Sequence, residues 1–278
     1  MSFSRSPLRQ LTALALGALT LTSGALRADH HLEDQASFWG ALTGPARSAD
    51  HVRRDVYRKP LETLEFFGLK ANMTVLESWP GGGWYTEILA PYLAEEGLLI
   101  GATYNRDPAT QLEWQGRYNA AFDAKLAEDP ASFGAVQISS LKDGTSTIAE
   151  AGSVDLILDF RNAHNWLRQG GTVPEAWFKA LKTGGVVGIV DHSARPEVAY
   201  DPSNGYLHES QVIEAMVAAG FRLLGRSDHL ANPLDRGNHA KGVWTLPPTL
   251  RLGEENQNHY LAIGESHRMA LKFLKPAN

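Results

Sequence analysis

The 278-residue sequence contains no cysteine. This excludes disulfides, thiolate metal sites, cysteine nucleophiles and lipid attachment through a cysteine. Positive charge is not in excess: 26 lysines and arginines stand against 31 aspartates and glutamates, so nothing points to a nucleic acid as a partner. Gly-x-Ser-x-Gly, a phosphate loop with Gly-Lys-Ser/Thr and His-Glu-x-x-His are all missing. Their absence argues against a serine hydrolase, a P-loop nucleotidase and a common class of zinc enzyme.

Residues 1–28 carry the features of a secretory signal peptide. Arg5 and Arg9 precede an apolar run, Leu11–Leu21, which is too short to cross a bilayer, since a spanning helix needs about 20 residues. Small residues follow, with Ser23-Gly24-Ala25 or Leu26-Arg27-Ala28 as the cleavage pattern. A buried N-terminal helix is the alternative. The segment has no adjacent arginine pair, which favours the general secretory (Sec) route over the twin-arginine route.

The sequence after this segment predicts a soluble, exported protein. Removal of residues 1–28 takes away three arginines, so the formal net charge of −5 becomes −8. No later stretch is long and apolar enough to span a membrane. We therefore expect a periplasmic or secreted protein without stable membrane insertion.

The remaining sequence alternates between apolar strand patterns and helical patterns. Its apolar runs are continuous, which is typical of parallel strands buried on both faces. The alternation predicts a single-domain, doubly wound α/β fold over residues 29–278, with a helical lead at residues 36–68. The expected strands are Thr74–Leu76, Leu98–Tyr104, Val136–Ser139, Val154–Phe160, Gly185–Asp191, Phe221–Ser227 and Gly242–Leu246.

The last two expected strands differ from the others, because no helical pattern separates them. Phe221–Ser227 follows a predicted helix from about Glu209 to Ala219, and Gly242–Leu246 comes next. We therefore expect these two strands to form an antiparallel hairpin at the edge of an otherwise parallel sheet.

Ligands of such a sheet bind beyond the carboxyl ends of its strands. The first strand leads into Glu77-Ser78-Trp79-Pro80-Gly81-Gly82-Gly83-Trp84-Tyr85. Glycines let a backbone approach a ligand closely, and the start of the next helix offers unpaired N–H groups. A tight strand-to-helix turn explains the same glycines equally well. The third glycine of a dinucleotide-binding pattern is missing, because Thr86 stands at that position.

Two further strand ends are rich in groups that bind, stack or move protons. The fourth strand leads into Asp159-Phe160-Arg161-Asn162-Ala163-His164-Asn165-Trp166, and the fifth ends at Asp191-His192. We expect His164 and His192 to project into one crevice, where an imidazole suits proton transfer near neutral pH. A ligand-positioning donor and a helix cap are the other interpretations of His192.

Three arginines lie close together in the helical lead. Arg53, Arg54 and Arg58 stand near Asp55 and Glu62. Local ion pairs on a solvated helix face are the simpler interpretation of this pattern. A lid that binds an anion is the alternative.

Taken together, these motifs resemble the class I S-adenosylmethionine-dependent methyltransferases, and within them a group of exported bacterial predicted methyltransferases of unknown substrate. The resemblance covers nearly all of residues 45–275. The motifs that carry it are Arg54-Asp55-x-Tyr57-Arg58-Lys59-Pro60, the Glu77–Tyr85 turn, Phe160-Arg161-Asn162-x-His164-Asn165-Trp166, Val190-Asp191-His192, Ala231-Asn232-Pro233, Gly242–Pro248 and Gly264-Glu265-Ser266-x-Arg268-Met269.

The resemblance implies a Rossmann-like methyltransferase fold, with a mostly parallel seven-stranded sheet and a C-terminal antiparallel hairpin. It implies S-adenosylmethionine as the cofactor, with Glu77 near its ammonium group. The turn residues Pro80, Gly81, Gly82 and Gly83 would hold its methionine part, and Tyr85 is a further cofactor-binding candidate.

Further roles follow from the same resemblance. Asp159 would line both cofactor and substrate, and Asn105 stands where the family has an acid that binds the ribose hydroxyls. In a methyltransferase built this way, His164 or His192 would take the proton of the acceptor, a role that suits an imidazole near neutral pH. Arg161 and Asn162 would orient that acceptor.

The function expected from these residues is methyl transfer to an unidentified small-molecule acceptor, without a metal. One alternative is an exported binding protein that kept the fold and lost methyl transfer. The other is a hydrolase or lyase that uses Asp159, His164, Asp191 and His192, which could also hold a metal.

Overall fold

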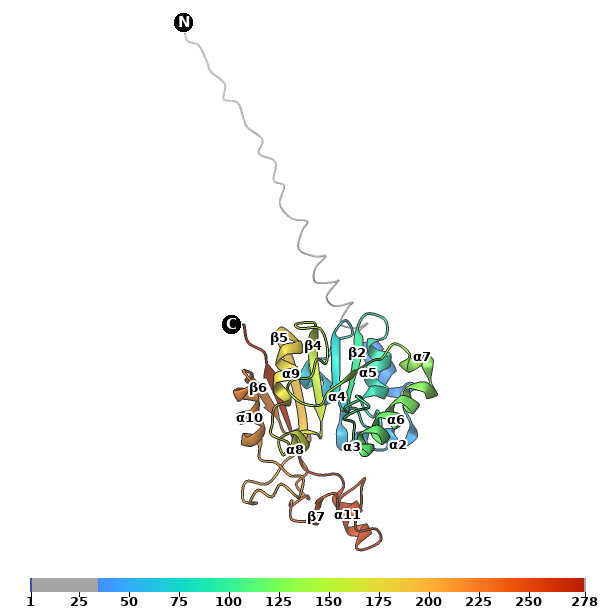
Figure 1. Cartoon of the computed structure of the whole chain (residues 1–278), viewed down its shortest axis with the longest axis vertical. Helices are drawn as coiled ribbons and strands as arrows, with labels where there is room; N and C mark the ends of the chain where they lie inside the picture. Colours follow the sequence, from blue (N-terminus) through green and yellow to red (C-terminus); the bar gives the residue numbers. More distant parts are fainter. Residues whose placement is uncertain (2–34, 278) are drawn as a thin grey trace.

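The computed structural model describes Met1 and residues 35–277, so the predicted signal peptide falls outside the described residues apart from Met1. Within this part of the chain, seven strands form one sheet in the order β3-β2-β1-β4-β5-β8-β6 (Figure 1). The strands are β1 (Thr74–Ser78), β2 (Leu98–Thr103), β3 (Gln137–Ser140), β4 (Val154–Phe160), β5 (Leu181–His192), β6 (Arg222–Ser227) and β8 (Arg268–Leu274).

The predicted fold class, a mostly parallel doubly wound sheet, is confirmed. Strands β3, β2, β1, β4 and β5 pair in parallel, whereas β8 runs antiparallel to both β5 and β6. The chain winds outward in opposite directions from the neighbouring strands β1 and β4. A crevice therefore opens between their carboxyl ends, where ligands of such sheets bind.

The antiparallel pair at the sheet edge is confirmed, but its second strand is not the predicted Gly242–Leu246. The partner of β6 is β8, and β7 (Ala240–Val243) lies outside the sheet. Strand β8 suits the sheet because it is buried on both faces, with Leu271 and Phe273 in one core and Ala270 in the other. Val243, by contrast, packs into a small separate apolar cluster.

Helices cover both faces of the sheet, and side chains of one strand alternate between them. Val75 faces α4 (Pro60–Phe67) and α5 (Thr86–Leu93), whereas Leu76 faces α9 (Val173–Ala180) and α10 (Glu209–Ala218). The continuous apolar runs of the sequence are therefore explained by two cores. The other helices are α2 (Ala49–Val52), α3 (Asp55–Arg58), α6 (Glu113–Glu128), α7 (Pro130–Phe133), α8 (Ala163–Trp166) and α11 (Gln257–Ile263), besides helical residues 35–43.

The predicted helical lead, residues 36–68, consists of several short helices. Helices α2 and α3 are separated at Arg53 and Arg54, and Lys59, with φ +40°, ends α3 before Pro60 starts α4. Proline at the first position of a helix costs little, because its missing N–H would be unpaired there. This break decides where Arg54 and Arg58 point.

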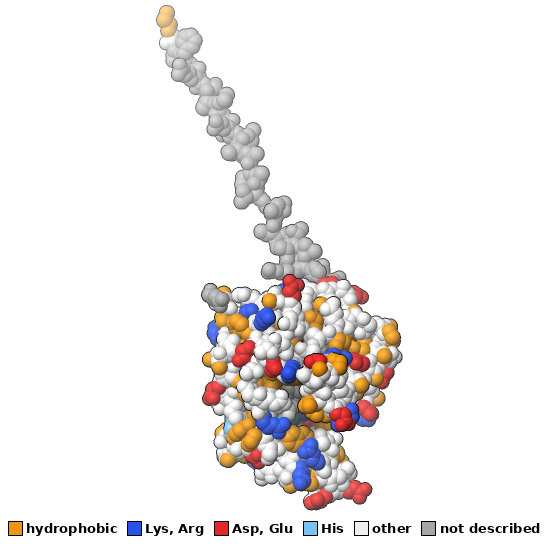
Figure 2. Space-filling model, viewed as in Figure 1, with side chains coloured by type: hydrophobic (Ala, Val, Ile, Leu, Met, Phe, Trp, Pro, Cys, Tyr) orange, Lys and Arg blue, Asp and Glu red, His pale blue; other side chains and the backbone are white. Residues whose placement is uncertain are grey.

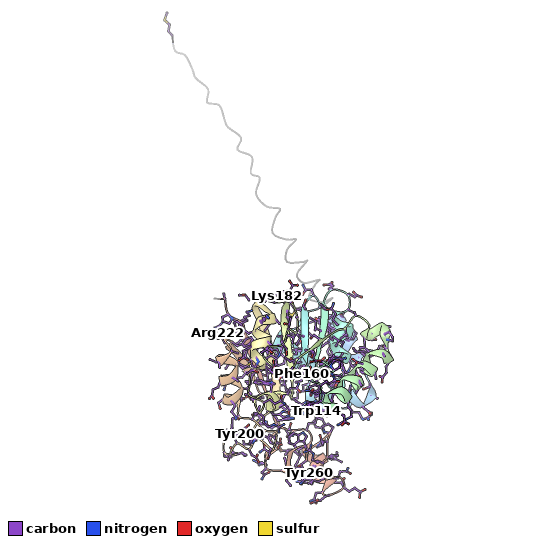
Figure 3. All side chains as sticks on the ribbon, viewed as in Figure 1. Trp114, Phe160, Lys182, Tyr200, Arg222 and Tyr260 are labelled. Carbon is purple, nitrogen blue, oxygen red and sulfur yellow. The ribbon has the colours of Figure 1, made fainter. Side chains whose placement is uncertain are left out.

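The C-terminal segment lies beyond one end of the sheet. Figure 1 shows β7 and α11 on the same side as α8, next to the carboxyl ends of the parallel strands. In Figure 3, Lys182 lies at the amino end of β5, while Tyr200 and Tyr260 lie beyond the opposite, carboxyl ends of the parallel strands. The loops that follow β5 and β6 therefore extend over the crevice.

The surface carries both signs of charge. Figure 2 shows acidic and basic side chains interspersed over the face in view, with no field of one sign. Among the described residues, no helix combines the length and the apolar character that crossing a membrane requires.

Candidate functional site

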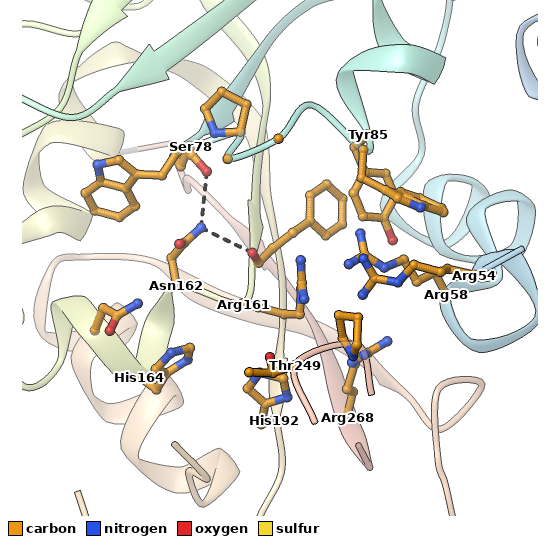
Figure 4. Close-up of a pocket in the computed structure, with 18 of the residues that line it drawn as sticks. Arg54, Arg58, Ser78, Tyr85, Arg161, Asn162, His164, His192, Thr249 and Arg268 are labelled. Atoms are coloured by element: carbon orange, nitrogen blue, oxygen red, sulfur yellow. Dashed lines mark hydrogen bonds between the residues drawn. The ribbon is translucent and has the colours of Figure 1, made fainter. Parts of the chain in front are cut away.

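A cavity of about 340 Å³ lies at the carboxyl ends of β1 and β4 (Figure 4). This is the lower end of the range typical of small-molecule sites. Its walls come from several separate segments of the described chain: the helical lead, the glycine turn after β1, the residue after β2, the segment after β4, the end of β5, the C-terminal loops and the start of β8. The lining includes His51, Arg54, Arg58, Glu77, Ser78, Trp79, Pro80, Gly81, Gly82, Trp84, Tyr85, Tyr104, Phe160, Arg161, Asn162, His164, Asn165, His192, Val243, Trp244, Pro247, Pro248, Thr249 and Arg268.

The glycine turn forms an open wall of this cavity. Gly81 has φ +60°, a conformation that disfavours other residues. A Cβ atom built on Gly82 would meet no heavy atom within 4 Å, and one on Gly81 would meet only the Trp79 carbonyl oxygen at 4.0 Å. Of the four turn residues predicted to hold the cofactor, Pro80, Gly81 and Gly82 line the cavity, whereas Gly83 lies outside it.

Glu77 places a buried carboxyl group at the cavity. The side chain is 3% exposed, and the Thr86 hydroxyl donates a 2.6 Å hydrogen bond to it. Burial raises the pKa of Glu77 to about 7, although the Thr86 hydrogen bond and the charge of Arg58 oppose the rise. The neighbouring Ser78 hydroxyl is also buried and has no partner among the described residues. A cationic ligand group beside Glu77 would restore its ionised form.

Asn162 connects the ends of β1 and β4. Its side-chain amide donates to the carbonyl oxygens of Ser78 and Phe160 and to the carboxylate of Asp159. Asp159 is fully buried and also accepts a 3.0 Å hydrogen bond from the indole N–H of Trp166. Burial raises the pKa of Asp159 to about 7. Asp159, predicted to line the site, is not among the residues that line the cavity, and it contacts the lining residue Asn162 instead.

His164 is held by Asp191 at the end of β5. Its Nδ1 lies 3.0 Å from Asp191 Oδ1, and its backbone N–H donates to Oδ2 at 2.9 Å. Burial alone raises the pKa of Asp191, but the charge and hydrogen bond of His164 and the N–H of His192 lower it to about 2. The ionised carboxylate can only accept, so Nδ1 carries the proton and Nε2 is left as the ring nitrogen for a ligand.

The same contact sets the basicity of His164. Burial lowers the pKa of its imidazole, but the charge and hydrogen bond of Asp191 outweigh burial and raise it. His192 differs, because burial lowers its pKa well below the ordinary value. Its Nδ1 shares a 2.6 Å hydrogen bond with the Ser266 hydroxyl. The two rings lie 5.4 Å apart between centroids, so both predicted histidines do face one crevice.

These residues also form a possible metal-binding group. Single ligand atoms of His164, Asp191 and His192 lie within 4.8 Å of one another. However, the Asp191 oxygens already accept two backbone N–H groups and the imidazole of His164. A metal bound to Asp191 would have to displace these donors.

The predicted local ion pairs of the helical lead are wrong for Arg54 and Arg58. Both face Glu265 in the C-terminal segment: Arg54 Nε lies 2.6 Å from Oε1, and Arg58 Nε lies 3.8 Å from Oε2. Asp55 instead pairs with Arg47. The break between α2 and α3 turns these two arginines toward the cavity, and the alternative of a lid that binds an anion stays a prediction.

The end of β2 presents an aromatic side chain to the cavity in place of the expected Asn105. Asn105 is buried and donates its side-chain N–H to Thr110, whereas Tyr104 lines the cavity and stacks on Trp79 with centroids 5.9 Å apart. Tyr85, predicted for cofactor binding, lines it too and stacks on Phe160 at 3.5 Å.

Several lining residues were not predicted for the site. Trp244 covers the cavity and makes a T-shaped contact with His164, at 6.1 Å between centroids. Arg268 and Trp244 stand in the motifs that carry the family resemblance, and that was their only signal in the sequence, whereas Arg58 also belongs to the arginine group of the helical lead.

No family model matches the chain, and no curated protein matches it. Solved structures do match. A SAM-dependent methyltransferase from Aquifex aeolicus is 16% identical, with 80% of this chain and 92% of that chain covered and a TM-score of 0.53. The [4+2]-cyclase SpnF is 14% identical, with 90% of this chain and 96% of that chain covered and a TM-score of 0.55.

A third structure is phosphoethanolamine N-methyltransferase 2 from Haemonchus contortus, in complex with S-adenosyl-L-methionine. It is 15% identical, with 80% of this chain and 53% of that chain covered and a TM-score of 0.52. Identities of this size show a common fold, and a cyclase is among the similar structures, so the chemistry has to be argued from the cavity. The chain has the α/β fold of S-adenosylmethionine-dependent methyltransferases.

Proposed function

We propose that this protein transfers the methyl group of S-adenosylmethionine to a small-molecule acceptor in the described cavity. The proposal rests on two groups of residues that face each other across the cavity and form two of its walls. One wall is the open turn at Gly81 and Gly82 with the buried carboxyl of Glu77, and the other is the imidazole of His164 held by Asp191.

The residues of the first wall fit the cofactor. Glu77 would bind the ammonium group, and the space over Gly81 and Gly82 would take the methionine chain. Tyr104 and Trp79 offer an aromatic surface to the purine ring. When bound, S-adenosylmethionine supplies a methyl group on a sulfonium ion, which a nucleophile can attack in line.

The second wall supplies proton transfer and orientation. The neutral imidazole of His164 would accept the proton of the acceptor at Nε2, while Asp191 keeps Nδ1 protonated and stabilises the imidazolium that forms. Asn162 and Asp159 are positioning residues, because their contacts keep the ends of β1 and β4 together. His192 stays neutral and orients the acceptor.

Two alternatives remain distinct from methyl transfer. A binding protein that kept this fold would show no affinity for the cofactor. A metal-dependent hydrolase or lyase is favoured by the proximity of His164, Asp191 and His192. Metal content and cofactor binding separate these alternatives from the proposal.

Calorimetric titration with S-adenosylmethionine and S-adenosylhomocysteine is expected to show binding of both, weakened about tenfold or more by Gly82→Val. The added side chain meets no atom of the protein at its Cβ, so it occupies ligand space without disturbing the fold. Gly40→Val is the matched control, since a Cβ there also meets nothing within 4 Å and lies away from the cavity. No heat from either ligand, with folded protein, would contradict the proposal.

We also propose that the protein is exported and loses its N-terminal segment. The intact mass of protein from the periplasmic fraction or the medium is expected to match a chain that begins at Leu26 or Asp29. A variant without residues 2–28 should stay in the cytoplasm. Recovery of cytoplasmic protein that retains residues 2–28 would contradict export.

A further inference from the structure

Arginine side chains gather on one side of the cavity. Among the described residues, Arg54, Arg58, Arg161 and Arg268 converge there (Figure 4). All but Arg161 form an ion pair with the carboxylate of Glu265. The side chains of Arg58 and Arg268 are 3% exposed. Three of these four buried or half-buried cations therefore share a single carboxylate partner within this part of the structure, and Arg161 has no ion-pair partner there.

Glu265 satisfies only part of this cluster. It accepts hydrogen bonds from Arg54 Nε and Arg268 Nη2, but Arg58 is too distant for one. Within the described residues, Arg54 Nη2, Arg58 Nε and Nη2, and Arg268 Nε are buried without a hydrogen-bond partner. Arg161 makes neither a side-chain hydrogen bond nor an ion pair there.

Such an arrangement is costly unless an anion completes it. Buried N–H donors without acceptors lose their hydration without replacement, and like charges in a poorly solvated site repel one another. Burial and the charge of Arg268 lower the pKa of Arg161 to about 10, so the guanidinium stays charged at neutral pH. Planar guanidinium groups are matched to the paired oxygens of carboxylates and phosphates.

The cofactor accounts for one negative charge at most. The carboxylate of a bound S-adenosylmethionine would neutralise one arginine, Glu265 neutralises another, and two positive charges would still face the cavity. Arg161 and Arg268 are the arginines whose charges act on His192, and Arg161 also acts on His164. Arg161, which has no ion-pair partner within the described residues, lines the same cavity as His164, so uncompensated charge lies on the side where the acceptor has to bind.

We propose that Arg161 and Arg268, supported by Arg58, form a subsite for a carboxylate or phosphate group of the methyl acceptor. The assignment rests on the proposed methyl transfer. It narrows the acceptor to a small anionic molecule, held by its oxyanion at the arginines, with its nucleophile directed at His164.

Inorganic phosphate and acetate are the probes, titrated separately into the full mature chain at constant ionic strength, with and without saturating S-adenosylhomocysteine. We expect phosphate or acetate to bind both with and without S-adenosylhomocysteine. The probe that binds more tightly indicates whether the acceptor carries a phosphate or a carboxylate group. Arg161→Asn should weaken this binding about tenfold or more. Asparagine tolerates the φ of +64° at this position, and no ion pair is lost.

The control and a second readout separate binding from a structural role. Arg53→Asn removes an exposed arginine that pairs with Asp50, and it should leave probe binding unchanged. The melting temperature of ligand-free Arg161→Asn should equal or exceed that of the parent, because repulsion is relieved. A clearly lower melting temperature together with unchanged probe binding would overturn the subsite.

The titrations also separate the subsite from the cofactor site. Loss of probe binding in the presence of S-adenosylhomocysteine would show that the arginines serve the cofactor's own carboxylate, which overturns the acceptor subsite. Absence of any probe binding at about 10 mM, well above the usual range of metabolite affinities, would overturn it as well. Probe binding without binding of S-adenosylhomocysteine would support the anion site and contradict methyl transfer.

Discussion

His164→Ala is expected to lower the rate of methyl transfer about 10²- to 10⁴-fold, the range of general base catalysis, and to leave the affinity for S-adenosylmethionine almost unchanged. His164 faces the acceptor side of the cavity, with Nδ1 held by Asp191, so its loss removes the proton acceptor and spares the glycine turn. The measurement is formation of S-adenosylhomocysteine with a panel of small carboxylate- and phosphate-bearing nucleophiles. His259→Ala, an exposed histidine, is the control.

The pH profile tests the role of Asp191 in the same reaction. A base must be neutral, so the rate should rise with pH through the raised pKa of His164. Asp191→Asn removes the charge that favours the imidazolium, and it should move this inflection to lower pH and lower the plateau. Direct titration of His164 by nuclear magnetic resonance gives the same shift without an acceptor.

Two results would contradict this assignment. Equal losses of turnover and cofactor affinity in His164→Ala would show that the histidine binds the cofactor. A stoichiometric divalent metal in protein purified without chelator, lost in the variant, would make His164 a ligand and favour the hydrolase or lyase.

Glu77→Gln is expected to weaken S-adenosylmethionine binding about 10- to 100-fold at pH 8, the size of one charge-assisted contact in a buried site. The carboxyl has a pKa of about 7 in the free protein because it is buried. A cationic ligand group requires its ionised form, so parent affinity should rise with pH from 6 to 8, by at most about tenfold per unit. Glu77→Gln should abolish this pH dependence.

Stability distinguishes a binding role of Glu77 from a structural one. Its pKa in the folded protein lies above the ordinary value, so the ionised group destabilises the ligand-free fold as pH rises through about 7. Glu77→Gln should therefore melt at the same or a higher temperature at pH 8. Glu113→Gln, at an exposed position, should change neither property. Unchanged cofactor affinity in Glu77→Gln would contradict the assigned contact.

The sheet was largely predictable because strand patterns are local. Strand β4 has the predicted bounds, Val154–Phe160, since seven consecutive residues that suit a buried strand leave little choice. The exception is instructive: Gly242–Leu246 has a strand-like composition, yet β8 takes the edge position. Only pairing across the sheet, with burial on both faces, separates these two candidates.

The site was predictable to the extent that strand ends meet at one edge of a parallel sheet. For this reason Glu77, Arg161 and both histidines line one cavity, as the sequence indicated. Asn105 was predicted for the site, but the preceding residue, Tyr104, lines the cavity instead. Successive side chains at a strand end point in opposite directions, so an error of one residue exchanges the side chain that faces a ligand.

The sequence by itself determined the fold class and the strand ends at which chemistry can occur, because hydrophobic patterns and turns act over a few residues. Tertiary structure alone decided which groups face one another. Arg54 and Arg58 meet Glu265 across about two hundred residues of chain, and His164 meets Asp191 from a neighbouring strand. Burial and partner charge set the pKa of a group and the ligand it selects, and both exist only in the folded chain.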